Sequence, residues 1–186
     1  NMARFKEVQM TIADSAKNYL NIYNMQFFIE HFTLEREGRF SLALHNMEPP
    51  FPISATASFI YDAFQTGMTL YEESTTDENS DVDTFIELEF TIRLPFMDDY
   101  PDIEALIDEI SEEYPDTDPI LTIKEIIGDD EPFKDYEIYY SYDIDAEDAT
   151  DSELYDEIFE ELKDIMELIY ERTEKYIDLS WYRGDE

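Results

Sequence analysis

The sequence of 186 residues contains no cysteine, which excludes disulfide bonds, zinc–thiolate sites and cysteine nucleophiles. Basic residues are also scarce, since 12 Lys and Arg stand against 48 Asp and Glu and the formal net charge is −36. Direct binding to nucleic acid or to an anionic membrane requires clustered Lys and Arg. We therefore expect neither of these partners.

Motifs of catalysis and of membrane insertion are absent as well. With four glycines, the sequence shows no Gly-x-Gly-x-x-Gly or Walker pattern, and it has no Gly-x-Ser-x-Gly. The sequence has no run of 18 or more apolar residues, so it predicts no transmembrane helix. The first residues also lack the apolar core of a signal peptide. We expect a non-catalytic, cytoplasmic protein without a cofactor.

The composition nevertheless supports a folded protein. Hydrophobic residues make up 43% of the chain and aromatic residues 15%, well above the level of a disordered segment. A chain of this length buries enough surface for one core. We expect a single domain over residues 1–186, with an acidic mobile loop at 72–83 and a tail at 179–186.

The negative charge is distributed unevenly along the chain. Residues 1–71 hold seven acids and five bases, a net charge of −2, whereas residues 72–186 hold 41 acids and seven bases, a net charge of −34. A surface adapted only to high salt should be acidic throughout. The asymmetry therefore favours a polarised surface over a uniform one.

The hydrophobic periods predict helices and strands in a definite order. Helical spacing predicts a helix over 11–23 with Thr11 as its N-cap, a helix after Pro101, and a long amphipathic helix over 151–177 that Thr150 and Glu153 begin with a capping box. Alternation predicts strands at 27–34, 40–45, 54–62, 68–72, 84–94, 120–127 and 135–143, with a short helix as the alternative at 120–127.

These elements predict an α+β fold. Its antiparallel sheet should carry an N-terminal helix, a middle helix and the long C-terminal amphipathic helix packed on it. Residues 35–38 should form the turn of the first hairpin, because Gly38 can adopt a positive φ angle.

Candidate metal sites do not match a known pattern. The acidic segment 143–154 resembles a calcium loop, but its sixth residue is Asp148 instead of Gly and its twelfth is Leu154 instead of Glu. The segment that begins at Asp77 also lacks the Gly. His31 and His45, on the two strands of one predicted hairpin, could approach each other, but ordinary surface histidines are the better interpretation. We expect no metal.

Two groups of side chains are candidates for binding. Tyrosine is a favoured contact residue, although the same ring also suits the rim of a small core. The long helix should present an acidic face opposite its apolar face. The candidate set is Tyr136, Tyr140, Tyr142, Glu157, Glu160, Glu161 and Asp164.

The C-terminal portion resembles a known family. The aromatic strand from Asp135 to Ile144 leads through an acidic turn, 145–150, into the long acidic helix, and a helix with a short strand precedes it. This order is similar to that of the YbjN-like proteins, whose fold is similar to type III secretion chaperones. The resemblance implies a small, acidic, usually dimeric protein that binds an unfolded segment of a partner.

The sequence leaves three functions open. The preferred one is an acidic protein-interaction module, chaperone-like or regulator-like, that binds a basic or partly unfolded protein segment and can form a homodimer. The second is a nucleic-acid mimic that inhibits a DNA-binding protein, which needs carboxylates spaced like phosphates. The third is a highly charged soluble protein whose function is unrelated to its charge.

Overall fold

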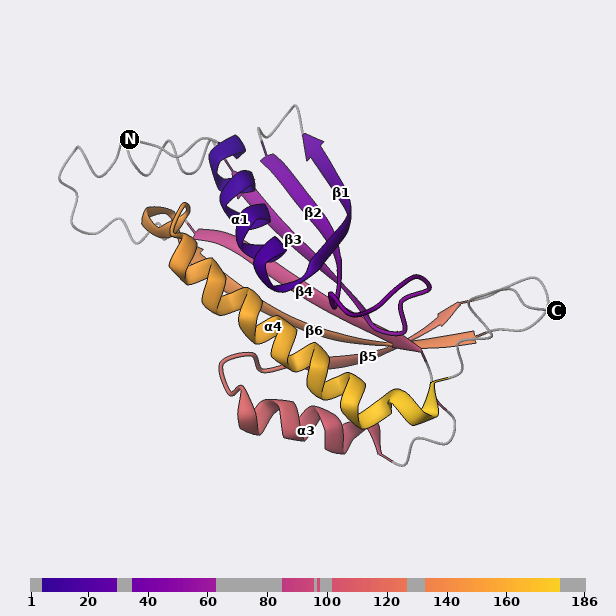
Figure 1. Cartoon of the computed structure of the whole chain (residues 1–186). Helices are drawn as coiled ribbons and strands as arrows, with labels where there is room; N and C mark the ends of the chain where they lie inside the picture. The colour runs from indigo at the N-terminus through magenta and orange to yellow at the C-terminus, as the bar shows by residue number, and fades with distance from the viewer. Residues whose placement is uncertain are drawn as a thin grey trace, which may run out of the picture.

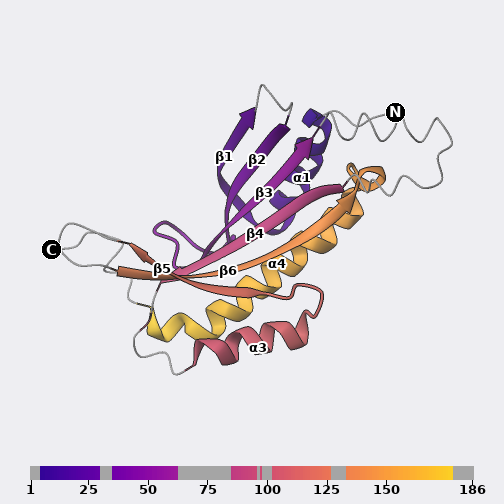
Figure 2. The same cartoon turned by 180° about the vertical axis from the view of Figure 1, so that it is seen from behind.

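The computed structural model describes residues 5–29, 35–62, 85–95, 97, 102–126 and 133–177. Within them, six strands form one antiparallel sheet in the order β1-β2-β3-β4-β6-β5. The α-helices of these residues all lie on the same face of the sheet, as Figure 1 and the reverse view in Figure 2 show. The predicted α+β class, with an N-terminal, a middle and a long C-terminal helix packed on an antiparallel sheet, is confirmed.

The strands are β1 Asn21–Ile29, β2 Glu35–Ala43, β3 Ser54–Asp62, β4 Phe85–Pro95, β5 Ile120–Ile126 and β6 Phe133–Asp145. The helices are α1 Phe5–Tyr19, α3 Ile103–Glu113 and α4 Ser152–Thr173, and the short 3₁₀ segments are η1 Ala146–Asp148 and η2 Glu174–Tyr176. After β4 the chain passes through α3 to the edge strand β5. It then returns as β6, between β5 and β4.

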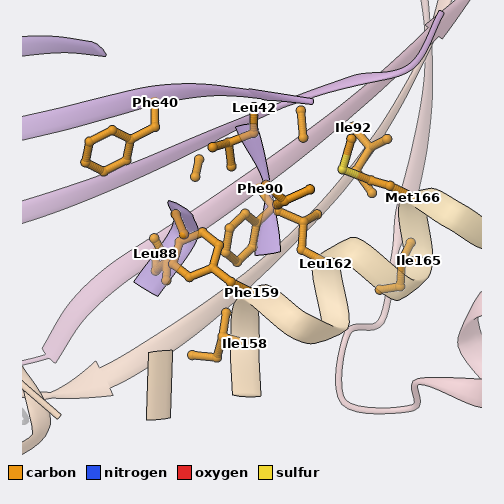
Figure 3. Close-up of a cluster of buried hydrophobic side chains, with 14 of the residues drawn as sticks. Phe40, Leu42, Leu88, Phe90, Ile92, Ile158, Phe159, Leu162, Ile165 and Met166 are labelled. Carbon is orange, nitrogen blue, oxygen red and sulfur yellow. The ribbon is translucent and has the colours of Figure 1, made fainter. Parts of the chain in front are cut away.

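The hydrophobic core lies between α4 and the centre of the sheet (Figure 3). Phe90 of β4 is its centre, since its ring packs edge-on against Phe159 of α4 at 5.6 Å and lies 5.2 Å from the ring of Tyr140 on β6. Such aromatic pairs add about 0.5–1.5 kcal/mol each to the burial of their area. The core therefore depends on α4 as much as on the strands.

The two faces of the sheet differ in polarity because side chains alternate along each strand. The face toward the helices carries the apolar residues of β2, β3, β4 and β6. The opposite face is polar, and its central strands present mainly Ser, Thr and Glu. At one end of β4, Arg93 on this polar face donates from Nε to Oδ2 of the buried Asp135, at 2.7 Å.

The N-terminal helix differs from the prediction. It begins at Phe5 and ends at Tyr19, because Val8 extends the apolar stripe of Ile12 and Ala16 by one turn toward the N-terminus. Thr11 is therefore not an N-cap, and its Oγ1 donates to the carbonyl of Glu7 within the helix, at 2.8 Å. Residues 21–23 belong to β1, so the first strand also begins earlier than the sequence indicates.

The predicted turn at 35–38 is wrong, because these residues are part of β2. Gly38 pairs with Phe27 on one side and with Phe59 on the other. A Cβ atom at position 38 would overlap the ring of Phe59. The glycine therefore makes room for an aromatic ring on the neighbouring strand, which a turn signal cannot reveal.

Other predicted elements agree more closely. Residues 120–126 form a strand and not the alternative helix, and the predicted strands at 54–62, 84–94 and 135–143 correspond to β3, β4 and β6. The long helix begins after Asp151, whose side chain caps its N-terminus. The N-cap is therefore one residue later than the predicted Thr150. The described chain has no helix long and apolar enough to cross a membrane. The predicted strand at 68–72, the loop at 72–83, His31 and the tail at 179–186 lie outside the described residues.

Candidate functional site: an acidic surface on two helices

One face of α4 carries a continuous row of carboxylates. Its members recur three or four positions apart, so they follow one another along the helix. The members are Glu153, Glu157, Glu160, Asp164, Glu167 and Glu171. All of them are exposed except Asp164, which is half-exposed. At 1.5 Å per residue, the row is about 27 Å long and holds one charge per about 5.4 Å.

A second, shorter row lies on α3, which runs beside α4 in Figures 1 and 2. It consists of the exposed residues Glu104, Asp108 and Glu112. The two helices are joined by Arg172 of α4, which donates from Nη2 and Nε to the two carboxylate oxygens of Glu109, at 2.8 and 3.3 Å. We call the two rows together the acidic helical surface.

Few cations offset this charge. Helix α3 contains no Lys or Arg, and α4 contains Lys163 and Arg172. The Nζ atom of Lys163 lies 3.8 Å from Oδ1 of Asp164, and Arg172 is engaged by Glu109 and Glu171. Like charges four residues apart cost a helix about 0.2–0.5 kcal/mol per pair. The rows therefore weaken the helices that carry them and leave charge available for a cationic partner.

Glu161 links the core to the acidic helical surface. Its half-buried carboxylate accepts a hydrogen bond from the hydroxyl of Tyr142 on β6. Burial raises the pKa of Glu161 above its usual value, and the negative charges of Asp116 and Asp164 raise it further. The structure thus brings Tyr142, Glu161 and Asp164 of the candidate set together, with Glu157 and Glu160 exposed on the same helix.

The other two candidate tyrosines lie in the core. Tyr136 is 6% exposed and Tyr140 is 1% exposed, so their rings support the sheet below the helices and do not contribute to the surface. The Tyr140 hydroxyl has no hydrogen-bond partner among the described residues. Burial raises its pKa far above the usual range, and the charge of Glu161 adds to this effect. Tyr114, at the C-terminal end of α3, is half-buried near Glu161 and Asp164.

A second acidic cluster lies on the open face of the sheet. Glu87 of β4 is directly opposite Asp143 of β6, and Glu89 follows two positions later on the same face. A hydrogen bond to Glu89, together with burial and the charges of Glu89 and Asp143, raises the pKa of Glu87. Alternation in the sequence indicated the polar face of each strand. The pairing of β4 with β6, which assembles the cluster, has no local signal.

Among the described residues, no three or more His, Cys, Asp or Glu side chains are grouped so that they could hold a metal ion. His45 is exposed in the turn that follows β2. The acidic helical surface and the cluster on the open face of the sheet present carboxylates and tyrosine hydroxyls, which can attract cationic groups and form hydrogen bonds with them.

Comparisons of the chain with protein-family models, with curated proteins and with solved structures find no match. The resemblance to the YbjN-like proteins therefore remains a prediction from the order of elements.

Proposed function

We propose that this chain is a non-catalytic, cytoplasmic interaction module that binds a basic, partly unfolded segment of a partner protein on the acidic helical surface. The observation that carries the proposal is the row of carboxylates on α4, which few cations offset. A row of one sign attracts partners of the opposite sign and accelerates their encounter.

The spacing of the row favours a segment that becomes helical when it binds. Lys or Arg residues repeated every three or four positions lie along one face of a helix, at the same average interval of about 5.4 Å as the carboxylates on α4. The apolar residues of such a segment can contact the half-buried rings of Tyr114 and Tyr142 beside the row. The partner is therefore a basic amphipathic segment.

The resemblance to YbjN-like proteins and to type III secretion chaperones supports the same kind of function. It implies a small acidic protein that holds an unfolded segment of its partner. The asymmetry between residues 1–71 and 72–186 also supports a directed surface over a uniformly acidic coat.

The charge density argues against a nucleic-acid mimic. Duplex DNA carries one charge per about 1.7 Å of its axis, whereas the α4 row carries one per about 5.4 Å. The α3 row adds charge along a helix of 11 residues, which is half the length of the 22-residue α4. The charges on α4 are too widely spaced, and the row on α3 is too short, for the acidic helical surface to reproduce the charge pattern of a duplex.

The test measures binding of a labelled peptide of about 20 residues, with Lys and Leu at helical spacing, by fluorescence polarisation at several salt concentrations. The helix variant combines Glu157→Gln, Glu160→Gln and Asp164→Asn on α4. The matched control is Glu87→Gln, Glu89→Gln and Asp143→Asn, which removes the same number of charges from the open face of the sheet. We expect the helix variant to weaken binding at least about tenfold and the control less than about twofold.

Equal weakening by the two variants would show that binding follows net charge alone, and this would contradict the proposal. Absence of binding by the unmodified protein at low salt would also contradict it. The chain could instead bind a folded DNA-binding protein in competition with duplex DNA and fail to bind the peptide. That result would contradict the proposed interaction module and favour the nucleic-acid mimic.

A further inference from the structure

The edge strand β1 contains no charged residue. Its sequence, Asn-Ile-Tyr-Asn-Met-Gln-Phe-Phe-Ile, also lacks proline and glycine, although 32% of the whole chain is charged. Proteins usually protect edge strands with Lys, Pro or bulges, since unpaired backbone groups there bind other strands. The opposite edge follows this rule, because β5 carries Lys124 and Glu125. The pairing of β1 with β2 shifts register once, between Ile22 and Asn24, and the regularly paired remainder, residues 24–29, carries none of these protections.

Large apolar side chains are exposed on both faces of β1. Tyr23 and Met25 are each 46% exposed, Phe28 is 44% exposed and Phe27 is 40% exposed. Phe27 lies on the helix side, where its ring packs edge-on against Phe5 at 6.5 Å. Phe28 lies on the open side, with the Arg39 guanidinium 5.2 Å from its ring centre. A strand added to this edge would continue the apolar surface on both faces.

The position of β1 also decides which partner can approach it. Sheet order places β1 at one edge, with β2 and β3 before β4. These first strands and α1 belong to residues 1–71, whose net charge is −2, whereas the net charge of −34 begins after them. A cationic partner is attracted to the other end of the molecule. The β1 edge suits an uncharged strand.

We propose that β1 pairs antiparallel with β1 of a second copy of this chain, so that the two sheets become one continuous sheet across a two-fold axis. Strands are spaced about 4.8 Å apart, so seven spacings separate the two β4 strands by about 34 Å. This distance is about four Debye lengths at physiological salt. The acidic parts of the two copies are therefore screened from each other, and both acidic helical surfaces stay at the outer ends.

The pairing is self-complementary and closed. A two-fold interface brings the same strand from both copies, so Met25, the central residue of β1, approaches its counterpart. Further growth would have to occur through β5, where the charge of Lys124 opposes pairing. The structure therefore predicts a dimer and not a fibre.

The test is the mass in solution, measured by sedimentation equilibrium and native mass spectrometry between about 1 and 100 µM. The unmodified chain should be a dimer. Met25→Glu and Met25→Lys should each weaken dimerisation at least about tenfold, and a mixture of the two variants should form a mixed dimer. The matched control Ile123→Glu, at an apolar residue on β5 that is 54% exposed against 46% for Met25, should leave the dimer intact.

A second measurement needs no substitution. Hydrogen exchange of the amides of residues 21–29 should slow as the concentration of the unmodified protein rises, whereas exchange in β5 should not change. A monomer at all concentrations would overturn the proposal. A dimer that Ile123→Glu disrupts and Met25→Glu does not would overturn it too. Peptide binding by the monomeric variants remains measurable, so this result is independent of the proposed function.

Discussion

Among single residues, Glu161 has the clearest energetic conflict. Burial, together with Asp116 and Asp164, raises the pKa of its carboxyl group in the folded protein. The native state then binds this proton more tightly than the unfolded state does, so the contribution of Glu161 to stability is largest below the unfolded pKa. It is lost as the pH rises through the folded pKa. Ionised Glu161 therefore reduces stability at neutral pH.

We predict that Glu161→Gln increases the free energy of unfolding near pH 7 by up to about 1 kcal/mol, since the site is only half-buried and solvent screens it. The amide oxygen can still accept the hydrogen bond from Tyr142. The difference should disappear below about pH 4, where the unfolded carboxyl group is protonated as well. Urea unfolding between about pH 3 and 8 measures this effect, with the exposed Glu157→Gln as control. A loss of stability that is the same at every pH would contradict the prediction.

The sequence predicted which face of β6 each tyrosine occupies, but not what covers that face. Alternation placed Tyr136, Tyr140 and Tyr142 together, as the register of β6 with β4 confirms. Their exposure depends on where α4 crosses the sheet, and this crossing involves residues distant in the sequence. Two of the three rings are therefore core residues, while the carboxylates of α4 lie where the helical period indicated.

At the scale of one element, the start of α4 depends on Asp151. Its Oδ1 accepts hydrogen bonds from the backbone N–H groups of Glu153 and Leu154, at 3.1 and 3.4 Å. The carboxylate also lies at the positive end of the helix dipole. These interactions partly offset the repulsion along the acidic row.

We predict that Asp151→Ala lowers the free energy of unfolding by about 1 kcal/mol, because two N–H groups lose their acceptor. Asp151→Asn should retain most of the stability, since its side-chain oxygen can accept the same bonds. Thermal unfolding followed by circular dichroism compares the three proteins. Equal loss in the Ala and Asn variants would indicate that the charge matters and the cap does not.

Elements were predictable where period and polarity agreed, as in β4 and α4. The errors occurred where a residue serves a neighbour in space. Gly38 was interpreted as a turn residue, but it accommodates the ring of Phe59 on another strand. Similarly, α1 begins before Thr11 because Val8 packs in the core, which overrides a favourable capping residue.

At the scale of the whole molecule, the net charge of −36 opposes the compact state. Salt shortens the range of this repulsion, from about 30 Å at 0.01 M to about 8 Å at 0.15 M.

We predict that raising NaCl from about 0.01 to 0.5 M increases Tm by about 5 °C, which corresponds to about 1–2 kcal/mol for a chain of this size. Differential scanning calorimetry measures the shift, and KCl at equal ionic strength should give the same result. The variant with Glu157→Gln, Glu160→Gln and Asp164→Asn should show a smaller shift. A Tm that does not change with ionic strength would show that the acidic groups are too well separated to affect folding.

The contact between the first and last helices has a consequence for biosynthesis. Ser15 of α1 donates to Asp156 of α4 at 2.6 Å, across 141 residues of sequence. Until the ribosome has released α4, Phe90 and its neighbours on the sheet lack the helix that covers them. Contacts between such distant residues slow folding and lengthen the exposure of apolar surface. The acidic residues between positions 72 and 150 leave the ribosome before α4, and we expect their mutual repulsion to oppose the association of incomplete chains.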